Sequence, residues 1–203
     1  MPVVNRCLVA NLLVLLMVAE PSVATGTGFF DRMGVAMGVN FPRGNGVMDS
    51  GVYPIGVSLR VDGSHPTSTP VDLELLSGID IMVDIGGGGY VALPVLLNAT
   101  REVADLGGGF LLLSGFFGLG YSYHHLFSVI RGVTLEKQHS LAFDVGLKVS
   151  VALGERWRVF LRGGAFRSFT RPVNAYFSGT RVTSGSRFAY GTLPVLIGIS
   201  RRM

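Results

Sequence analysis

The chain has 203 residues, of which 15% are charged and 29 are glycine. Its mean hydropathy of +0.48 is high, and soluble globular proteins usually carry about 25% charged residues. The formal net charge of +4 includes no basic cluster, so nucleic acid is not an expected partner. No uncharged apolar run reaches the roughly 18 residues of a membrane-spanning helix. The composition disfavours disorder, a disulfide scaffold and a helical membrane protein, and it leaves a β-barrel membrane protein as an option.

The N-terminal segment has the layout of a secretory signal peptide. Arg6 precedes the apolar stretch 8–19, and the small residues Ser22 and Ala24 follow it. We expect cleavage after Ala24, which leaves 25–203 as the barrel domain. The alternative is an uncleaved anchor, although the apolar stretch is short for a membrane span.

Beyond this segment, apolar residues recur at every second position. In 140–153, the odd positions from Leu141 to Leu153 are all apolar, and the even positions are small or polar. Strict alternation indicates a β-strand. The same pattern predicts an all-β chain with eight strands, at 33–41, 51–61, 71–85, 90–98, 109–123, 139–153, 157–169 and 188–202.

The composition of the two strand faces predicts which face meets lipid. The face opposite the large apolar residues consists of glycine, alanine and serine with a few charges, which does not resemble a solvated exterior. An eight-stranded barrel has room inside only for side chains, so small residues suit its interior and the apolar face meets lipid. Aromatic residues near strand ends fit the girdles of such barrels. They are Phe41, Tyr53, Tyr121, Tyr123, Trp157 and Phe169.

With these features the chain resembles the small eight-stranded outer-membrane β-barrels of the W, X and A-domain type. The resemblance implies a transmembrane antiparallel up-and-down barrel in the bacterial outer membrane, embedded in lipid and inserted by the barrel-assembly machinery. Members of the group typically end in an aromatic residue, whereas this chain ends in Met203, and Arg201 interrupts the apolar face of the last strand.

The strand count predicts the sidedness of the loops if both termini are periplasmic. The periplasmic segments are then 62–70, 99–108 and 154–156. The extracellular segments are 42–50, 86–89, 124–138 and 170–187.

The alternation also directs a set of charged side chains into the lumen. They are Arg60, Asp72, Glu74, Asp80, Asp84, Asp144, Lys148, Arg158 and Arg162. The tight turn at 154–156 places Lys148 opposite Arg162, and like charges repel. We expect Asp80 and Asp144 to be their counter-charges. Two interpretations stay open: ion pairs that plug the barrel, or a polar conduction path.

Two further groups of residues are candidates for binding. Aromatic residues of inward parity predict a lining for a hydrophobic solute or, alternatively, the filling of a plugged lumen: Phe110, Phe116, Phe166, Phe188 and Tyr190. The segment 170–187 is basic and has no acidic residue, which predicts a contact surface for host or matrix ligands. Its candidate residues are Arg171, Tyr176, Phe177, Arg181 and Arg187.

Catalysis has little support in the sequence. The one candidate set is the His124-His125 pair with Ser128 and Glu136, in a stretch that reads as a loop. Outer-membrane lipid A deacylases place the serine two residues after the histidine, and that spacing is absent. The only cysteine, Cys7, lies in the signal segment. We therefore expect no enzyme, no cofactor and no metal.

Two functions follow from the sequence. The first is the passage of small hydrophobic solutes across the outer membrane, as the resemblance to W-type barrels implies. The alternative is a structural or adhesive surface protein that binds host or matrix ligands through 124–138 and 170–187.

Overall fold

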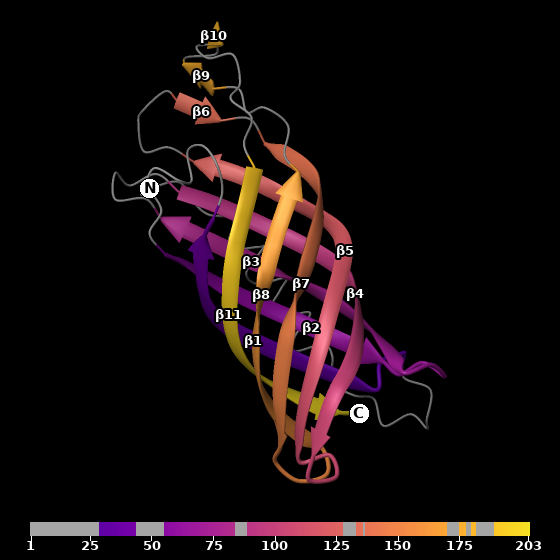
Figure 1. Cartoon of the computed structure of the whole chain (residues 1–203). Coiled ribbons are helices and arrows are strands. Elements are labelled where there is room, and N and C mark those ends of the chain that lie inside the picture. The colour runs from indigo at the N-terminus through magenta and orange to yellow at the C-terminus, as the bar shows by residue number, and fades with distance from the viewer. Residues whose placement is uncertain are drawn as a thin grey trace.

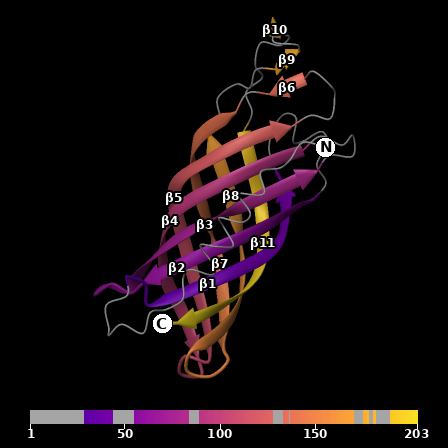
Figure 2. The ribbon, with the colours of Figure 1, turned by 180° about the vertical axis from the view of Figure 1, so that it is seen from behind.

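The computed structural model is dominated by one closed, tilted β-barrel (Figures 1 and 2). The structure describes residues 29–43, 55–83, 89–127, 133–135, 137–169, 175–177, 180–181 and 189–203. The expected signal segment 1–24 lies outside these residues. Within them, no helix is long and apolar enough to cross a membrane.

Eight strands form the wall of the barrel, in the order β1-β11-β8-β7-β5-β4-β3-β2. Their bounds are β1 Arg32–Pro42, β2 Gly56–His65, β3 Val71–Val83, β4 Gly89–Leu106, β5 Leu111–Phe127, β7 Gln138–Ala152, β8 Trp157–Phe169 and β11 Ala189–Arg202. Every neighbouring pair is antiparallel, and β1 pairs with both β2 and β11. The prediction of an eight-stranded antiparallel up-and-down barrel is therefore confirmed.

The two faces of the wall differ as the alternation predicts. Large apolar side chains project from the outer face and are exposed, among them Met37, Val57, Leu97, Leu119, Leu147, Leu161 and Ile197. The inner face buries small and polar residues with a few large ones. A soluble barrel would bury its large apolar side chains instead, so this exterior is one that lipid can solvate.

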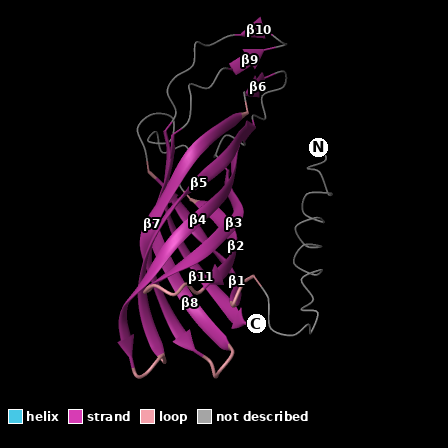
Figure 3. Ribbon diagram, turned by 90° about the vertical axis from the view of Figure 1, so that its right-hand side faces the viewer, coloured by secondary structure: helices cyan, strands magenta, loops and turns pink. Residues whose placement is uncertain are grey.

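The two ends of the barrel differ in the length of their connections. At one end, tight turns join β4 to β5 and β7 to β8, and Gly107, Gly108, Gly109 and Gly154 adopt the positive φ that these turns require. The C-terminus lies toward this end, and the small second sheet lies beyond the opposite end (Figure 3). We refer to the tight-turn end as periplasmic and to the other as extracellular.

The sequence-based strand limits need correction at the periplasmic end of the barrel. The fourth strand was expected to end at 98, but β4 continues to Leu106 because it pairs with β5 as far as Leu111. The expected periplasmic segment 99–108 is therefore largely strand. The second strand likewise continues to His65, which shortens the expected turn 62–70.

The alternation did not predict the second sheet. Strands β6 Val133–Leu135, β9 Ala175–Phe177 and β10 Thr180–Arg181 form a three-stranded sheet in the order β10-β9-β6. It joins parts of the two expected extracellular segments 124–138 and 170–187 above the barrel (Figure 1). Strands of two or three residues are too short to show a period-two pattern.

Candidate functional site

A buried cluster of charges ties three strands together inside the barrel. Glu74 on β3 accepts hydrogen bonds from Lys148 on β7 and Arg162 on β8, with 3.0 Å between Lys148 Nζ and Glu74 Oε2. Arg162 also donates to Asp144, with 2.9 Å between Nη2 and Oδ2. The side chains of Glu74 and Arg162 are only 3% and 5% exposed. Removal of these charges from water is costly, so the cluster is stable only because its members satisfy one another.

Lys148 and Arg162 face each other as the sequence predicts, but only one of their two predicted counter-charges contacts them. Lys148 lies directly opposite Arg162 in the register of β7 and β8. Asp144 contacts Arg162 as expected, whereas the second counter-charge is Glu74 rather than Asp80. Asp80 lies six residues farther along β3, which corresponds to about 20 Å. Local alternation assigns a side chain to a face but does not give its height relative to a strand across the lumen.

Asp62 joins the same cluster and was absent from the sequence-based set. Its Oδ2 lies 3.7 Å from Lys148 Nζ. The sequence reading ended the second strand at 61, so Asp62 was assigned to a turn. The parity of β2 would have directed Asp62 inward had the strand been extended by one residue.

A second buried network lies nearer the extracellular end. Arg60 on β2 forms an ion pair with Asp80 at 2.6 Å, and Asn40 on β1 donates to the same carboxylate at 2.8 Å. Ser58 bonds to both Asn40 and Asp80. These contacts join β1, β2 and β3 across the inside of the wall.

Aromatic rings lie against the two cations of the buried cluster, Lys148 and Arg162. The Arg162 guanidinium carbon lies 3.7 Å from the centre of the Phe116 ring, and Lys148 Nζ lies 4.3 Å from the centre of the Phe160 ring. Such contacts stabilise cations that have lost water. Gly146 and Gly164 are register partners under the Phe116 ring, and a Cβ on Gly164 would lie 3.1 Å from Phe116 Cζ.

The glycines beneath Phe116 give a direct test of this packing. A Cβ on Gly164 would also meet the Val145 carbonyl oxygen, whereas one on neighbouring Gly163 would meet nothing within 4 Å. We expect Gly164→Val to lower the free energy of unfolding by about 1–3 kcal/mol through overpacking. Urea unfolding of the refolded barrel in detergent measures the change. Gly163→Val is the control, and equal loss in both variants would contradict the packing argument.

Two other charges of the predicted lumen set, Asp72 and Arg158, lie outside the buried cluster. Asp72 is exposed at the periplasmic mouth and takes no part in the buried cluster. Arg158 is half-buried, and its Nη2 donates to the Gly109 carbonyl at 3.0 Å. Both corrections have one cause, because an inward side chain near the mouth still reaches water. Asp84 lies outside the described residues.

The candidate solute-lining residues do not form one group. Phe116 and Phe166 lie in the lumen and are 5% and 2% exposed. Phe110 lies beside the periplasmic turn and is 59% exposed, so its assignment to an outer-rim lining is wrong. Tyr190 is in β11 opposite Ser168, and Phe188 lies outside the described residues. The inward parity assigned to Phe110 fails because β5 begins at Leu111, two residues later than the expected start at 109, so Phe110 belongs to the turn.

Part of the candidate loop-contact set belongs to the second sheet. Tyr176 and Phe177 are in β9 and Arg181 is in β10, where Arg181 is the register partner of Tyr176. Arg171 and Arg187 lie outside the described residues. The small sheet thus gives three of the five candidates a common backbone scaffold.

His124 lies on a strand, not in the loop that the sequence suggested. It is buried in the lumen on β5, where its ring bonds to the Tyr90 hydroxyl and its Nε2 lies 2.8 Å from Ser140 Oγ. Ser128 and Glu136 lie outside the described residues. Within the part of the chain that the structure describes, no group of three His, Cys, Asp or Glu side chains could hold a metal ion.

Polar and apolar side chains together fill much of the lumen. The polar or charged residues buried in it include Asn40, Ser58, Arg60, Asp62, Glu74, Asp80, Asn98, Ser122, His124, Asp144 and Arg162. The large apolar ones include Leu76, Met82, Tyr90, Leu96, Phe116, Phe160 and Phe166. A channel filled with water would leave its lining exposed, whereas these side chains are almost wholly inaccessible.

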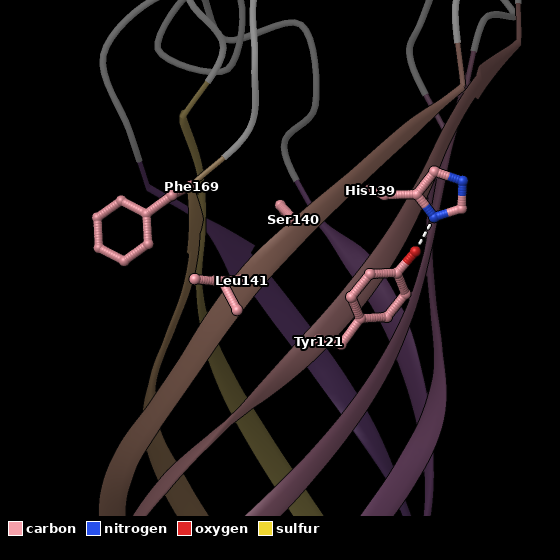
Figure 4. Close-up of a pocket in the computed structure, with 5 residues that line it drawn as sticks. All are labelled: Tyr121, His139, Ser140, Leu141 and Phe169. Atoms are coloured by element: carbon pink, nitrogen blue, oxygen red, sulfur yellow. Dashed lines mark hydrogen bonds between the residues drawn. The ribbon is translucent and has the colours of Figure 1, made fainter.

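A shallow depression lies outside the wall at the extracellular end, with a volume of about 340 Å³. Tyr121, His139, Leu141 and Phe169 line it from β5, β7 and β8, and the Tyr121 hydroxyl bonds to His139 Nδ1 (Figure 4). These side chains are exposed on the outer face. Tyr121 and Phe169 belong to the aromatic residues that the sequence placed near the strand ends.

Among solved structures, the barrel is similar to outer-membrane and surface proteins at low sequence identity. A major outer membrane protein from Thermus thermophilus is 16% identical, with a TM-score of 0.56 over 85% of this chain and 99% of that one. Neisserial surface protein A is 10% identical, with a TM-score of 0.54 over 88% of this chain and 99% of that one. No family model and no curated protein matches the sequence. The likeness shows that the chain has the fold of the small outer-membrane barrels.

Proposed function

We propose that this chain is a bacterial outer-membrane barrel with a closed lumen that acts at the cell surface as a structural or adhesive protein. The observation that carries the proposal is the cluster of Glu74, Lys148 and Arg162, whose side chains are 3%, 12% and 5% exposed. A cluster that holds β3, β7 and β8 together across the lumen stabilises the wall, and side chains so little exposed are typical of a filled lumen and not of an open channel.

The outer face supports the membrane location. Its exposed side chains are predominantly apolar through the middle of the wall, and lipid is the solvent in which such a surface is stable. Closure of the sheet supports the same conclusion, because lipid cannot satisfy the unpaired backbone groups of a sheet edge. Export by a signal peptide at 1–24 and insertion by the barrel-assembly machinery are parts of this proposal.

The extracellular sheet supports a role in contact. Rigid scaffolds commonly present their binding residues on the connections between strands. Thr134 on β6 and Arg181 on β10 are both register partners of Tyr176 on β9, so parts of the two long connections meet in one sheet. Matrix or host ligands with negative charge suit the basic segment 170–187.

Loop replacement tests the adhesive role. Purified barrel refolded in detergent is applied to immobilised heparin and to collagen, and the same is done with a variant in which a Gly-Ser linker replaces 170–187. We expect binding by the parent and its loss in the variant. A variant with a Gly-Ser linker at the periplasmic turn 66–70 is the control. Equal binding by all three proteins would contradict a role for the segment.

Conductance separates a closed barrel from passage of solutes, which the sequence resemblance suggested. We expect planar bilayers with the reconstituted barrel to show no conductance above that of lipid alone, because side chains of the lumen exclude water. A porin reconstituted in the same way is the positive control. Stable unitary conductance steps in the parent protein would contradict the closed lumen and favour solute passage.

A further inference from the structure

The exterior of β8 shows where the membrane-spanning part of the wall begins and ends. Between Trp157 and Arg167, the outward positions of this strand carry no charge. Ten residues of strand at a tilt of about 35–45° span about 25 Å along the barrel axis, which matches the apolar exterior of such barrels. We call this part of the exterior the apolar band. Side chains that point inward at its periplasmic edge face the mouth of the lumen and not lipid.

Two arginines project into the lumen at this edge. Arg158 on β8 and Arg32, the first residue of β1, have the inward parity of their strands, and β11 lies between these strands. Ser200 on β11 is the register partner both of Arg158 and of Gly34, which is two residues from Arg32 on the same face. Neighbouring strands are about 4.8 Å apart, so the backbones of the two arginines are separated by a distance that their long side chains can span.

Electrostatic coupling indicates that the two guanidinium groups lie close together. Arg32 precedes Met33, the first apolar residue of β1, so it lies outside the membrane-spanning segment. Burial lowers the pKa of Arg32, and the positive charge of Arg158 lowers it further, with a larger effect than that of any other charged group. Like charges act on each other this strongly only at short range.

Neither arginine has a carboxylate partner in the part of the chain that the structure describes. Arg158 bonds to a backbone carbonyl, and Nη1 of Arg32 is buried and bonds to none of the described groups. Two nearby carboxylates have other partners, since Asp31 lies 3.5 Å from Arg202 and Asp62 belongs to the buried cluster. Buried guanidinium N–H groups normally have an acceptor. Two positive charges and an unsatisfied donor are therefore present at the same mouth.

A depression of about 470 Å³ opens beside Arg158 at the periplasmic end. Gly107, Gly108 and Gly109 line it from the turn between β4 and β5, and Glu155 lines it from the turn between β7 and β8. The glycines have no side chains that could cover the guanidinium. A soluble ligand can therefore reach Arg158 from the periplasm without entering the filled lumen.

We propose that Arg32 and Arg158 bind a soluble phosphate-bearing anion at the periplasmic mouth, either inorganic phosphate or a phosphate monoester. The two guanidinium groups carry two positive charges, which a phosphate dianion neutralises and a single carboxylate does not. Arginine also bonds phosphate oxygens in a bidentate manner. Both side chains face the lumen, so the ligand comes from water and not from the lipid that covers the outer face. The site does not depend on an adhesive role of the extracellular sheet.

Isothermal titration calorimetry of the full refolded barrel in dodecyl maltoside tests the proposal. The probes are inorganic phosphate and glycerol phosphate, at low ionic strength and a slightly alkaline pH that keeps both as dianions. We expect one-to-one binding and about tenfold weaker binding by Arg32→Gln and by Arg158→Gln, since a charge-assisted hydrogen bond of about 1.5 kcal/mol corresponds to that factor. The probe that binds more tightly shows whether the site prefers the free anion or the ester.

Arg156→Gln is the matched control for these variants. Arg156 is in the exposed turn two residues before Arg158 and carries the same charge. Its replacement should leave phosphate binding nearly unchanged, whereas Glu155→Gln should strengthen binding because it removes a negative charge from the depression. Equal weakening by Arg156→Gln and Arg158→Gln would indicate only a general positive potential and would overturn the site. It would also be overturned if the parent bound neither probe, or if Arg32→Gln and Arg158→Gln bound as the parent does while their unboiled samples migrate as folded barrels.

Discussion

Replacement of Arg162 with methionine is expected to lower the free energy of unfolding by about 3–5 kcal/mol. Methionine fills a similar volume, but it leaves the buried carboxylates of Glu74 and Asp144 without the cation that now contacts both. It also removes the guanidinium from the face of Phe116. Urea titration of the barrel in detergent, followed by tryptophan fluorescence and by migration of unboiled samples, measures the loss.

Arg158→Met is the matched control for this experiment. Arg158 is on the same strand and has the same parity, but it is half-buried and bonds only to a backbone carbonyl among the described contacts. We expect its replacement to cost less than about 1 kcal/mol. The double variant Arg162→Met with Asp144→Asn should recover part of the loss, because it removes one uncompensated carboxylate. Equal stability of the parent and Arg162→Met would show that the buried charge cluster does not stabilise the barrel.

Replacement of Leu147 with arginine is expected to weaken folding into phosphatidylcholine vesicles by about 2–4 kcal/mol. Leu147 projects outward from β7, is 55% exposed and lies halfway along the apolar band. An arginine at this depth must be desolvated or must thin the bilayer locally. Urea titration of folding into vesicles, followed by migration on gels without boiling, gives the difference.

Leu153→Arg makes the same chemical change at the edge of the band. Leu153 lies beside the periplasmic turn and is also exposed. We expect its replacement to cost about 0–1 kcal/mol, because an arginine at the interface reaches water. A pair of variants with the same cost would contradict a bilayer centred on Leu147. Equal folding of both variants in water without lipid would contradict a membrane barrel altogether.

The sequence predicted the wall of the barrel because one face of each strand meets lipid and the other faces the polar lumen. In β7, apolar residues face outward at every odd position from Leu141 onward, and the inner positions are small, polar or charged. This alternation extends over enough residues to exclude a helix. The count of strands, their antiparallel order and the inward direction of Arg60, Glu74 and Arg162 follow from it.

The alternation rule failed where a strand continues beyond the apolar exterior of the barrel, as β4 does. Beyond Asn98, β4 includes Arg101, Glu102 and Asp105, and this run of polar residues reads as a loop. It remains a strand because β5 pairs with it, and backbone hydrogen bonds do not depend on side-chain polarity. The sequence also placed His124 in a loop. Its partners Tyr90 and Ser140 come from β4 and β7, and only the pairing of β5 with these strands brings them to His124.

The sequence by itself determined which residues face lipid and which face the lumen, because that choice depends only on the parity of a position within its own strand. The tertiary structure decided which charges meet. Glu74 rather than Asp80 contacts Lys148 and Arg162 because strands β3, β7 and β8 are staggered when the sheet closes. That stagger sets the height of each side chain across the lumen, and the register of all eight strands fixes it together.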